Sequence, residues 1–560
     1  MDSRRLILFI ALSLGLMLLW DKYVAPKTPD AQVATSQTTP ATTNNANAVV
    51  EGTNGLVDGD TINVTTDLMK VQISTVGGDI RDMALLHYTD YNDTSKPYNL
   101  LLNQGNRVFV AQTGLINSSS TIDLPNHKTV FHIDGGQTNF TMSPDEKTLK
   151  VNLTAIAESG NVVVVKTYTF TRGSYVVDVN YQIMNNSAQA LNGVSAYWRF
   201  LRDEQAPDGE TKFAHTFTGP VYYNDSAKFN AVKFDNLIKG DVEYPQTTTD
   251  GWVGFTEHYF TGLWLLNPYN HNAICSNGVV CHFNLKTVNG NLASSGVITD
   301  LPSIAGHSSY SIDVPMYVGP QAYHSMMNVA PEIERTKDYG WVYIFATPLF
   351  WLLVQIHQFV QNWGWSIVLL TLTVKAILFP LTRASYKSMA RMKALAPKIE
   401  RLKEQYGDDK AGMQQAMMKM YKEEKVNPIG GCLPMLLQVP VFIGLYWALL
   451  GSVELRQASF LWIHDLSKPD PYYILPLVLA VAMFLQTFLN PPAADPMQQK
   501  MMRFMPIAFS VMFFFFPAGL VVYWLVNNVL SMAQQWYVNN HINSANKHHG
   551  HKDHDKSSKK

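Results

Sequence analysis

The second half of the chain contains four long apolar stretches, which constrain the fold more than any other feature of the sequence. They cover residues 363–381, 428–450, 472–489 and 501–535. In the hydrocarbon core of a bilayer every backbone N–H and C=O needs a partner within the protein, so such stretches cross it as helices. The sequence therefore predicts a helical membrane unit with several spans after about residue 363.

The last stretch is too long for a single crossing. As one helix, residues 501–535 would extend about 52 Å, whereas the hydrocarbon core is roughly 30 Å thick. Pro517 and Gly519 stand in the middle of this stretch and should break the helix. We therefore expect a fifth span over 501–516 and a sixth over 518–540. The apolar stretch 501–535 leaves about 17 residues for each of the two crossings, which is short enough for the bilayer to thin beside them.

The N-terminus carries a further apolar segment. Arg4 and Arg5 precede fifteen apolar or small residues that end at Trp20. A cleaved signal peptide would have small residues at its cleavage site, but the chain has Tyr23 and Pro26 there. We therefore expect residues 1–25 to be an uncleaved transmembrane anchor whose basic end is cytoplasmic. Residues 26–57, which have almost no large apolar side chains, should form a flexible tether.

Between the tether and the membrane unit the pattern is that of β-structure. Short runs such as VNLTAIA, NVVVVKTYTF, SYVVDVNYQIM, AVKF, SSGVITDL and SYSIDVPMYVG are separated by Gly, Asn, Asp and Pro. This spacing predicts an antiparallel, all-β sandwich over residues 58–337, extended because the region is long for a single sandwich. Cys275 and Cys281 flank an Asn277-Gly278 turn signal. They could form a disulfide or remain two reduced thiols.

Charge distribution suggests the topology. Residues 25–335 carry 18 basic and 29 acidic side chains, residues 383–427 carry 11 and 6, and the last twenty residues carry 5 and 2. An even number of spans places the basic segments 383–427 and 541–560 on the cytoplasmic side with the N-terminus. We therefore expect six transmembrane helices. Residues 338–362, which are apolar but interrupted by Pro348 and His357, fit an amphipathic helix at the interface.

The remaining boundaries follow from these segments. The expected elements are a second span at 363–382, a cytoplasmic helical hairpin at 383–427, a third span at 428–450, a loop on the far side at 451–471 and a fourth span at 472–490. The hairpin has one helical run over 384–406, a break at Gly407, and a second run capped by Asp408 and Asp409. Its methionines could pack the two helices together or offer soft apolar surface to a substrate. They are Met389, Met392, Met413, Met417, Met418 and Met420.

Lys375 is the outstanding candidate site residue. It lies within the second span, about eight residues or roughly 12 Å before Arg383. A lysine inside a span costs at least about 2.5–3.5 kcal/mol, so it should face a polar interior rather than lipid. Thr371 is one turn earlier on the same face. Further polar or aromatic candidates are Gln438 and Tyr446 in the third span, Gln486 in the fourth, and a stripe in the sixth of Trp524, Asn527, Asn528, Ser531 and Gln535.

Enzyme signatures are missing from the sequence. It contains no HExxH, GxSxG, GxxxxGK[ST] or CxxC motif, so we expect neither enzymatic activity nor a cofactor. The tail KHHGHKDH could bind a metal through His548, His549, His551 and His554, but a disordered polar tail is the simpler interpretation.

Several longer strings resemble one known family. They are KAILFPLTRASYKSMARM (375–392), NPIGGCLP (427–434), GSVELRQASFLWIHDLSKPDPYYILP (451–476) and DPMQQKMMRFMP (495–506). They are similar to the bacterial YidC membrane protein insertases, densely over residues 340–540 and loosely over the sandwich.

The resemblance implies a core of five spans around a hydrophilic groove that is open to the cytoplasm and lipid. In Gram-negative members this core is joined by an N-terminal anchor and a periplasmic sandwich similar to sugar mutarotases, and the protein resides in the inner membrane. The family's groove commonly carries Arg where this chain has Lys375, which keeps the charge but loses the bidentate fork. Thr371 matches a groove position, while Gln486 and Trp524 are looser matches.

The function implied is insertion and folding of nascent membrane proteins, alone or with the Sec translocon. The implied partners include the ribosome, the signal recognition particle receptor pathway and membrane lipids. Two rival functions are a small-solute or ion transporter that uses Lys375 as a counter-charge, and a membrane-anchored periplasmic sugar-binding protein. The transporter predicts inverted repeats, which the sequence does not show. The sugar-binding protein would leave Lys375 and the hairpin unexplained.

Overall fold

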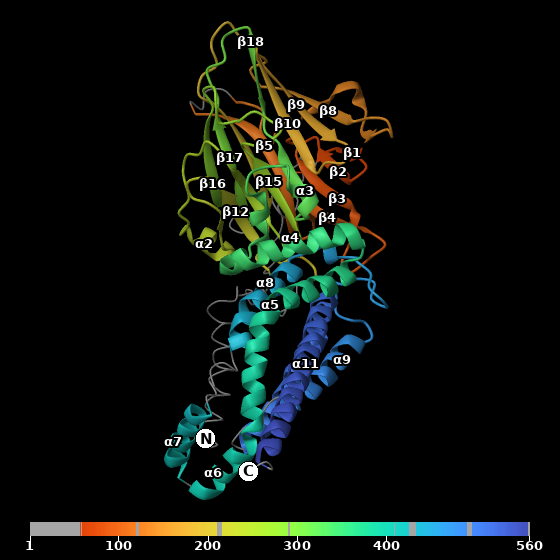
Figure 1. Cartoon of the computed structure of the whole chain (residues 1–560). Coiled ribbons are helices and arrows are strands. Elements are labelled where there is room, and N and C mark those ends of the chain that lie inside the picture. Colours follow the sequence, from red (N-terminus) through yellow and green to blue (C-terminus); the bar gives the residue numbers. More distant parts are fainter. Residues whose placement is uncertain are drawn as a thin grey trace, which may run out of the picture. The chain divides into compact units, whose positions relative to one another are not determined.

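The computed structural model describes residues 56–57, 59–118, 123–209, 216–288, 292–407, 409–424, 433–489 and 496–557. The chain divides at Asp338 into an all-β unit and a helical unit that begins at Tyr339 (Figure 1). The expected N-terminal anchor and nearly all of the expected tether lie outside the described residues.

The β-unit is a sandwich of two sheets, as the alternating pattern predicted. Within the described residues one sheet has nine strands in the order β16-β17-β11-β5-β4-β3-β2-β1-β7. All its neighbours are antiparallel except β1 and β7. Its strands are β1 (Thr61–Thr65), β2 (Met69–Ser74), β3 (Ile80–Thr89), β4 (Pro97–Gln104), β5 (Arg107–Asn117), β7 (Asn139–Thr141), β11 (Val194–Arg202), β16 (Val280–Val288) and β17 (Leu292–Asp300).

The second sheet has ten described strands and is antiparallel throughout its described pairings. Its order is β13-β12-β14-β15-β19-β10-β9-β8-β6, and β18 also pairs with β10. Its strands are β6 (His132–Ile133), β8 (Thr148–Ile156), β9 (Val162–Thr171), β10 (Val176–Asn185), β12 (Gly219–Tyr223), β13 (Asn230–Ala231), β14 (Trp252–Thr256), β15 (Phe260–Leu265), β18 (Ser308–Asp313) and β19 (Met316–Pro320). Of the runs expected to be strands, AVKF is a strand only at Ala231, the last residue of β13, and its Phe234 opens the short helix α2 (Phe234–Lys239).

Large aromatic side chains fill the space between the sheets. Trp198 of β11 and Trp264 of β15 are fully buried, with ring centroids 5.8 Å apart. Along β8 and β9 buried and accessible residues alternate strictly or nearly so, because successive side chains of a strand point to opposite faces. The inward set supplies the apolar core, and the outward set keeps the unit soluble.

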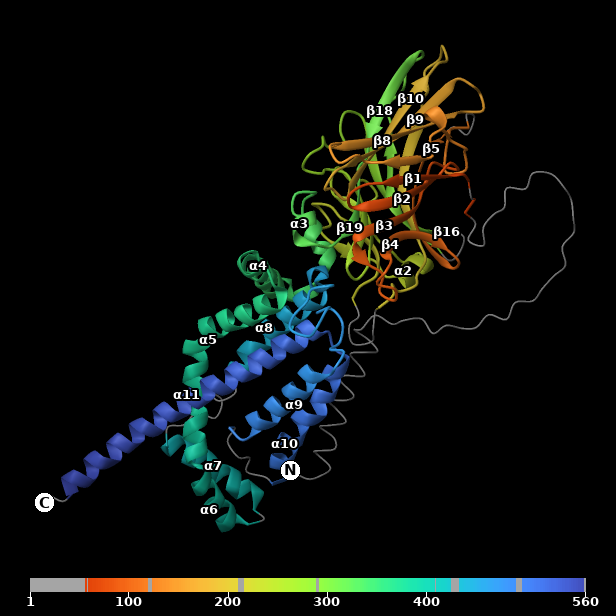
Figure 2. The ribbon, with the colours of Figure 1, turned by 90° about the vertical axis from the view of Figure 1, so that its right-hand side faces the viewer.

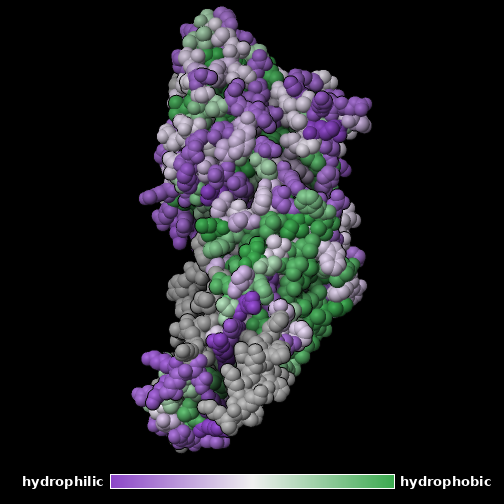
Figure 3. Space-filling model, in the orientation of Figure 1, coloured by the Kyte–Doolittle hydropathy of each residue, from purple (hydrophilic) through white to green (hydrophobic). Residues whose placement is uncertain are grey.

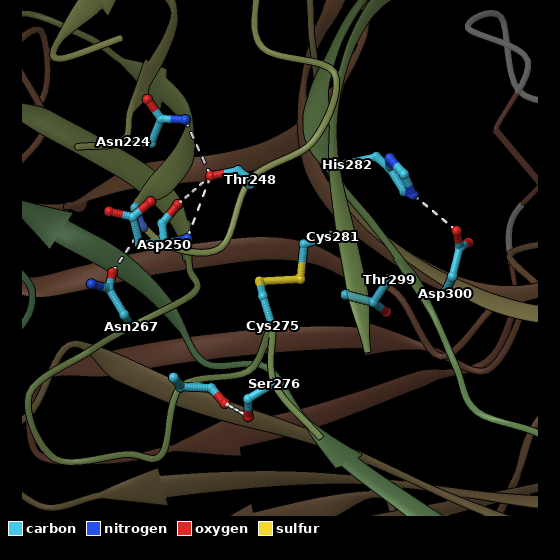
Figure 4. Close-up of a disulfide and its surroundings, with 12 residues drawn as sticks. Asn224, Thr248, Asp250, Asn267, Cys275, Ser276, Cys281, His282, Thr299 and Asp300 are labelled. Carbon is cyan, nitrogen blue, oxygen red and sulfur yellow. Dashed lines mark hydrogen bonds and ion pairs between the residues drawn. A yellow bond between two sulfur atoms is a disulfide. The ribbon is translucent and has the colours of Figure 1, made fainter. Parts of the chain in front are cut away.

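Cys275 and Cys281 form a disulfide, which decides between the two states that the sequence allowed (Figure 4). The bridge closes a tight turn in which Asn277 and Gly278 both have positive φ, a conformation that these two residue types adopt readily. Cys281 belongs to β16, whereas Cys275 lies in the loop after β15, so the bridge ties that loop to the sheet.

The described part of the helical unit consists of helices α4 to α11, joined by loops and short 3-10 turns. The helices are α4 (Tyr343–Val360), α5 (Trp363–Ala394), α6 (Ala396–Tyr406), α7 (Lys410–Glu423), α8 (Leu433–Leu450), α9 (Ile474–Thr487), α10 (Pro496–Ser510) and α11 (Ala518–Ser557), with the 3-10 turns η5 (Val453–Leu455) and η6 (Val511–Phe515). Helix α11 packs against α5 and α9, α9 packs against α10, and α4 packs against α5 and α8 (Figure 2).

Three helix boundaries differ from those expected. Helix α5 runs without a break from the expected second span through Ala394, so the expected single run over 384–406 is divided at Leu395. Pro397 explains this division, because it has no N–H for an interior helical bond and fits the first turn of α6. Helix α10 begins at Pro496, five residues before the expected fifth span. The structure also continues α11 through Ser557, where a disordered tail was expected.

The break between α10 and α11 was predicted correctly. Phe516 is extended, and α11 begins at Ala518. The backbone N–H groups of Ala518 and Gly519 donate to Lys468 O and Leu466 O, 2.8 and 2.9 Å away. The loop before α9 thus satisfies donors that a helix N-terminus otherwise leaves without partners.

On the face seen in Figure 3, the surface of the helical unit around α4 and α5 is mostly apolar, in contrast to the sandwich and to the hydrophilic α6–α7 end. Two described helices, Tyr343–Val360 and the Trp363–Met392 part of α5, are long and apolar enough to cross a membrane. Shorter apolar helices cover Gln438–Leu450, Ile474–Thr487 and Arg503–Phe515. By length and composition α4 therefore also passes the test for a span, whereas the sequence favoured an interfacial helix.

Candidate functional site: a buried lysine between three helices

Lys375 lies in the first half of α5 and is only 5% exposed. Its ammonium group donates a 2.7 Å hydrogen bond to Ser531 Oγ on α11 and a 3.2 Å bond to Gln438 Oε1 on α8. Three helices that are far apart in the sequence therefore meet at one cation.

Gln438 connects this cation to a second polar group. While its Oε1 accepts from Lys375, its Nε2 donates a 2.7 Å hydrogen bond to Asn527 Oδ1 on α11. Ser531 in turn donates to the backbone oxygen of Asn527 at 2.7 Å. Each side chain of this network has a partner, which lowers the cost of keeping polar groups in an apolar unit.

The network borders a pocket of about 400 Å³, a volume that includes its open mouth. Its lining combines a few polar groups with an apolar wall. The lining residues are Thr371, Val374, Lys375, Leu378, Thr382, Gln438, Val441, Leu445, Tyr523 and Asn527. Most of this volume is open to solvent, and the few polar groups of the wall can orient a small polar group at the mouth through hydrogen bonds.

The charge of Lys375 has no counter-charge in the part of the unit that the structure describes. No carboxylate there lies within 4 Å of its ammonium, and its described hydrogen-bond partners are neutral. A buried cation with only dipolar partners attracts anions more strongly than one already paired with a carboxylate. The pocket is therefore suited to an acidic group.

Thr371 occupies the same wall as Lys375, one turn earlier. It is 2% exposed, and its hydroxyl donates a 2.7 Å hydrogen bond to Ile367 O within α5. Its hydroxyl proton is thus already used, which leaves its oxygen as an acceptor at the pocket wall.

The stripe expected on the sixth span divides between two sides of α11. Asn527 and Ser531 point to the lysine network, but Trp524 packs against Phe442, Phe509 and Phe513. Gln535 donates a 3.1 Å hydrogen bond to Leu489 O beyond α9, and Asn528 bonds within α11 to Trp524 O. At about 100° per residue the stripe is wide enough to face two neighbours.

Two other candidates lie away from the pocket lining. Tyr446 of α8 packs against Phe442, Trp447 and Phe516. Gln486 is half-buried on α9. The structure thus brings together five of the nine groove candidates and leaves Tyr446, Gln486, Trp524 and Asn528 outside the pocket lining and the lysine network.

Sequence reasoning missed three residues at the site. Tyr523 and Thr382 line the pocket, and Gln534 Nε2 lies 3.4 Å from the backbone oxygen of Lys375. Two of them could have been found from helical spacing. Tyr523 and Gln534 are four and seven residues from Asn527 and therefore lie on the same face of the helix.

Helices α6 and α7 lie where the sequence predicted a cytoplasmic helical hairpin and pack against each other. The Asp409 side chain caps α7 by accepting from Gly412 N at 3.0 Å; Asp408 lies outside the described residues. Leu395 and Met420 form a small buried core, against which Met392 packs with neighbouring apolar side chains. Met413 and Met417 are half-buried and Met418 is exposed, whereas the side chain of Met389 is outside the description.

Comparison with known proteins covers almost the whole chain. Residues 61–352 match the YidC periplasmic domain, and residues 355–546 match the 60Kd inner membrane protein family. A membrane protein insertase YidC from Laribacter hongkongensis is 54% identical over 97% of this chain and 98% of its own length. The corresponding protein of Methylobacillus flagellatus is 45% identical over 96% of this chain and 97% of its own.

Two solved structures are more distantly similar. An active YidC insertase with its first transmembrane domain resolved shows 20% identity over 85% of this chain and 92% of its own, with a TM-score of 0.38. A galactose mutarotase related enzyme from Lactobacillus acidophilus shows 11% identity over 46% of this chain and 97% of its own, with a TM-score of 0.29.

Proposed function

The chain belongs to the YidC family of membrane protein insertases, and we propose that it inserts nascent proteins into the inner membrane through the pocket around Lys375. The observation that carries this proposal is the buried ammonium of Lys375 without a counter-charge, held by Gln438 and Ser531. No covalent bond is made or broken, so the protein acts as an insertase and chaperone and not as an enzyme.

The pocket lowers the cost of moving a short hydrophilic segment through the bilayer. An acidic side chain of the substrate would be attracted to Lys375, while Thr371, Gln438 and Asn527 would replace part of its lost water. The apolar part of the substrate would then leave along the exposed apolar helix faces into lipid. A polar pocket halfway across the bilayer would divide the one high free-energy barrier for the hydrophilic segment into two lower ones.

Helix lengths support a thinned bilayer at the fourth and fifth spans, whereas the fifth and sixth spans were expected to be short. The α9 helix has 14 residues, or about 21 Å, and the apolar part of α10 with η6 is Arg503–Phe515, about 20 Å. Both are well below a hydrocarbon core of roughly 30 Å. Helix α11 is long, so a short sixth span does not contribute.

We also propose the six-span topology. The spans would be the N-terminal segment 1–25, α5, α8, α9, α10 with η6, and α11, with α4 at the periplasmic interface. Both termini and the α6–α7 hairpin would be cytoplasmic, because the basic residues of 383–427 and 541–560 then lie inside. The sandwich would be periplasmic, in agreement with the family match of residues 61–352.

The hairpin and the tail are the proposed first contacts of a substrate. Exposed Met418 offers a soft apolar surface, although Met392 and Met420 pack the hairpin itself. The lysines of 541–560 could approach the phosphates of ribosomal RNA. The Sec translocon and the signal recognition particle receptor pathway are further proposed partners. Neither rival function, solute transport or sugar binding, has an observation in its favour.

A depletion experiment tests the assignment. The native protein is depleted, variants are supplied, and insertion of a small single-span protein with an acidic translocated tail is followed by protease protection. We expect Lys375→Ala to reduce insertion at least tenfold and Lys375→Arg to retain it, because the charge remains. A chain without most of the sandwich should still insert. The assignment would be overturned if sandwich deletion abolished insertion while Lys375→Ala had no effect.

A further inference from the structure

The outer face of the second sheet carries three metal-ligating side chains that protein insertion does not use. They are Asp178 of β10, Asp313 at the end of β18, and His271 in the loop after β15. Val177 and Val179 on either side of Asp178 are buried, so Asp178 points outward, away from the core. Asp313 is paired near it through the register of β10 with β18. Strand pairing therefore holds the two carboxylates on the same face.

The spacing of these groups suits a small divalent ion. One possible ligand atom from each residue lies within 4.8 Å of the others. His271 Nε2 and Asp178 Oδ1 are 3.2 Å apart. Ligands about 2.0 Å from a tetrahedral Zn²⁺ are separated by roughly 3.3 Å. Two of the three ligands are thus already at coordination spacing, and a side-chain rotation of exposed Asp313 would complete the set.

A second observation points to a ligand at the same place. Asp178 Oδ1 is a buried atom that accepts no hydrogen bond in the described part of the chain, and the geometry of its approach to His271 is not that of a hydrogen bond. Asp313 adds a second negative charge, and the cations that act on it among the described residues are His271 and Lys150 of β8. A histidine alone leaves this carboxylate oxygen under-coordinated, whereas a metal ion would satisfy it.

The disulfide keeps the histidine in position. His271 lies four residues before Cys275, and the Cys275–Cys281 bridge fixes the end of its loop to β16. The loop is also fixed at its other end, where Leu266 N donates to Gly251 O at 2.9 Å. A ligand on a loop closed at both ends loses less conformational entropy on binding a metal than one on a free loop.

We propose that Asp178, His271 and Asp313 bind a Zn²⁺ ion on the outer face of the sandwich. One imidazole nitrogen and two carboxylate oxygens form a three-ligand set, and the fourth position remains open to water or to an external carboxylate. The ion would fasten the disulfide-closed loop to β10 and β18. This site is separate from the pocket of Lys375 and does not depend on the proposed insertion mechanism.

Zinc binding should be measured on the full chain in detergent after the possible tail ligands have been removed. His548, His549, His551 and His554 are changed to Ser, because otherwise they could bind zinc themselves. Bound zinc is counted by elemental analysis, and the dissociation constant is obtained by competition with a chromogenic chelator. We expect one Zn²⁺ per chain, and we expect His271→Ala to weaken it at least tenfold, the minimum lost when even an outer partner is removed.

His282→Ala is the matched control. His282 Nε2 lies 2.9 Å from Asp300 Oδ2 on the same unit (Figure 4), and this histidine–aspartate pair has no third metal-ligating side chain among the described residues. This variant should bind zinc with unchanged affinity. Asp313→Asn, at an exposed strand end, should weaken zinc binding as His271→Ala does. It provides a second test if the His271→Ala chain does not fold. The proposal is overturned if the tail-substituted chain binds no zinc, or if it binds zinc with the same affinity after His271→Ala and after Asp313→Asn.

Discussion

Two buried cations, Arg202 in the sandwich and Lys375 in the helical unit, have opposite kinds of partner. In the sandwich, Arg202 is 1% exposed and donates to Glu257 Oε1 at 2.7 and 3.1 Å, and Glu257 also accepts from Tyr98 at 2.8 Å. In the helical unit, Lys375 is 5% exposed and has only neutral described partners, Gln438 and Ser531. One cation is neutralised by its own unit, and the other keeps its charge available.

This difference separates a structural role from a functional one. A buried ion pair with saturated hydrogen bonds holds two segments together and offers nothing to a ligand. A charge inside an apolar membrane span that is held only by dipoles carries a cost that the fold alone does not repay, and such groups occur in membrane proteins where substrates pass. The contrast therefore predicts that substitutions at Arg202 change stability, whereas those at Lys375 change insertion.

The largest effect on stability is expected for Arg202→Ala. It leaves the Glu257 carboxylate buried without its partner, which should lower the free energy of unfolding of the sandwich by about 3–5 kcal/mol. Pulse proteolysis of the full chain in a urea series measures this through the surviving sandwich fragment. The control is Lys228→Ala, because Lys228 and Asp225 form an exposed pair 4.0 Å apart; it should change stability by less than about 1 kcal/mol. Equal effects of the two substitutions would remove the contrast.

A smaller effect is expected from pH at Lys166. This side chain donates to Gly77 O and Gly78 O at 2.9 and 2.8 Å, and burial lowers its pKa to about 7, with Asp79 opposing the shift and Arg81 adding to it. Between pH 7 and the unfolded value of 10.5 the unfolded chain binds more protons, so stability rises with pH. The slope should approach at most about 1.4 kcal/mol per pH unit.

Urea midpoints of the sandwich from pH 7 to 9 test this titration. Lys166→Met removes the group at similar volume and should flatten the pH dependence, even though it lowers stability at every pH by leaving Gly77 O without its described donor, while Gly78 O keeps the hydroxyl of Tyr168. A slope that persists in Lys166→Met would assign the pH dependence to another group.

The smallest effect on stability is expected for Lys375→Met. Gln438 keeps its bond to Asn527, and Ser531 keeps its bond to the backbone of Asn527, so no polar side chain of the network is left without a partner. Because an uncompensated buried charge is removed, the thermal midpoint of the helical unit in detergent should stay the same or rise. A fall equivalent to more than about 2 kcal/mol would show that Lys375 has a structural role like that of Arg202.

Much of the sandwich could be predicted from the sequence, because a half-buried strand alternates apolar and polar residues at a period of two. The runs that became β8, β9 and β10 show this period clearly. The strand predicted for the run AVKF was only partly right, because four residues show too little periodicity to distinguish the end of a strand from the start of a helix. The sequence did not decide whether Cys275 and Cys281 form a disulfide, because the redox compartment and the geometry, and not the spacing, determine whether two thiols join.

At the site, the sequence identified the polar residues but did not show which of them lie together around Lys375. Lys375, Thr371, Gln438, Asn527 and Ser531 were found because a polar residue is conspicuous in an apolar span. Their separation from Trp524 and Gln486 depends on which helices neighbour α11 and α8, and a single sequence does not contain that information. The sequence also did not predict that α5 continues without a break. A change from apolar to charged residues marks a change of environment, but the backbone can remain helical across it.

A charge exchange tests the central claim, that Lys375 acts through its charge on an acidic substrate segment, most directly. Insertion of a single-span substrate with an acidic translocated tail is compared with that of a version whose acidic residues are changed to Lys, in chains with Lys375 and with Lys375→Glu. We predict that Lys375→Glu reduces insertion of the acidic tail at least tenfold and restores insertion of the basic tail. Equal loss of both substrates in Lys375→Glu would contradict the account, because the defect would then not depend on charge.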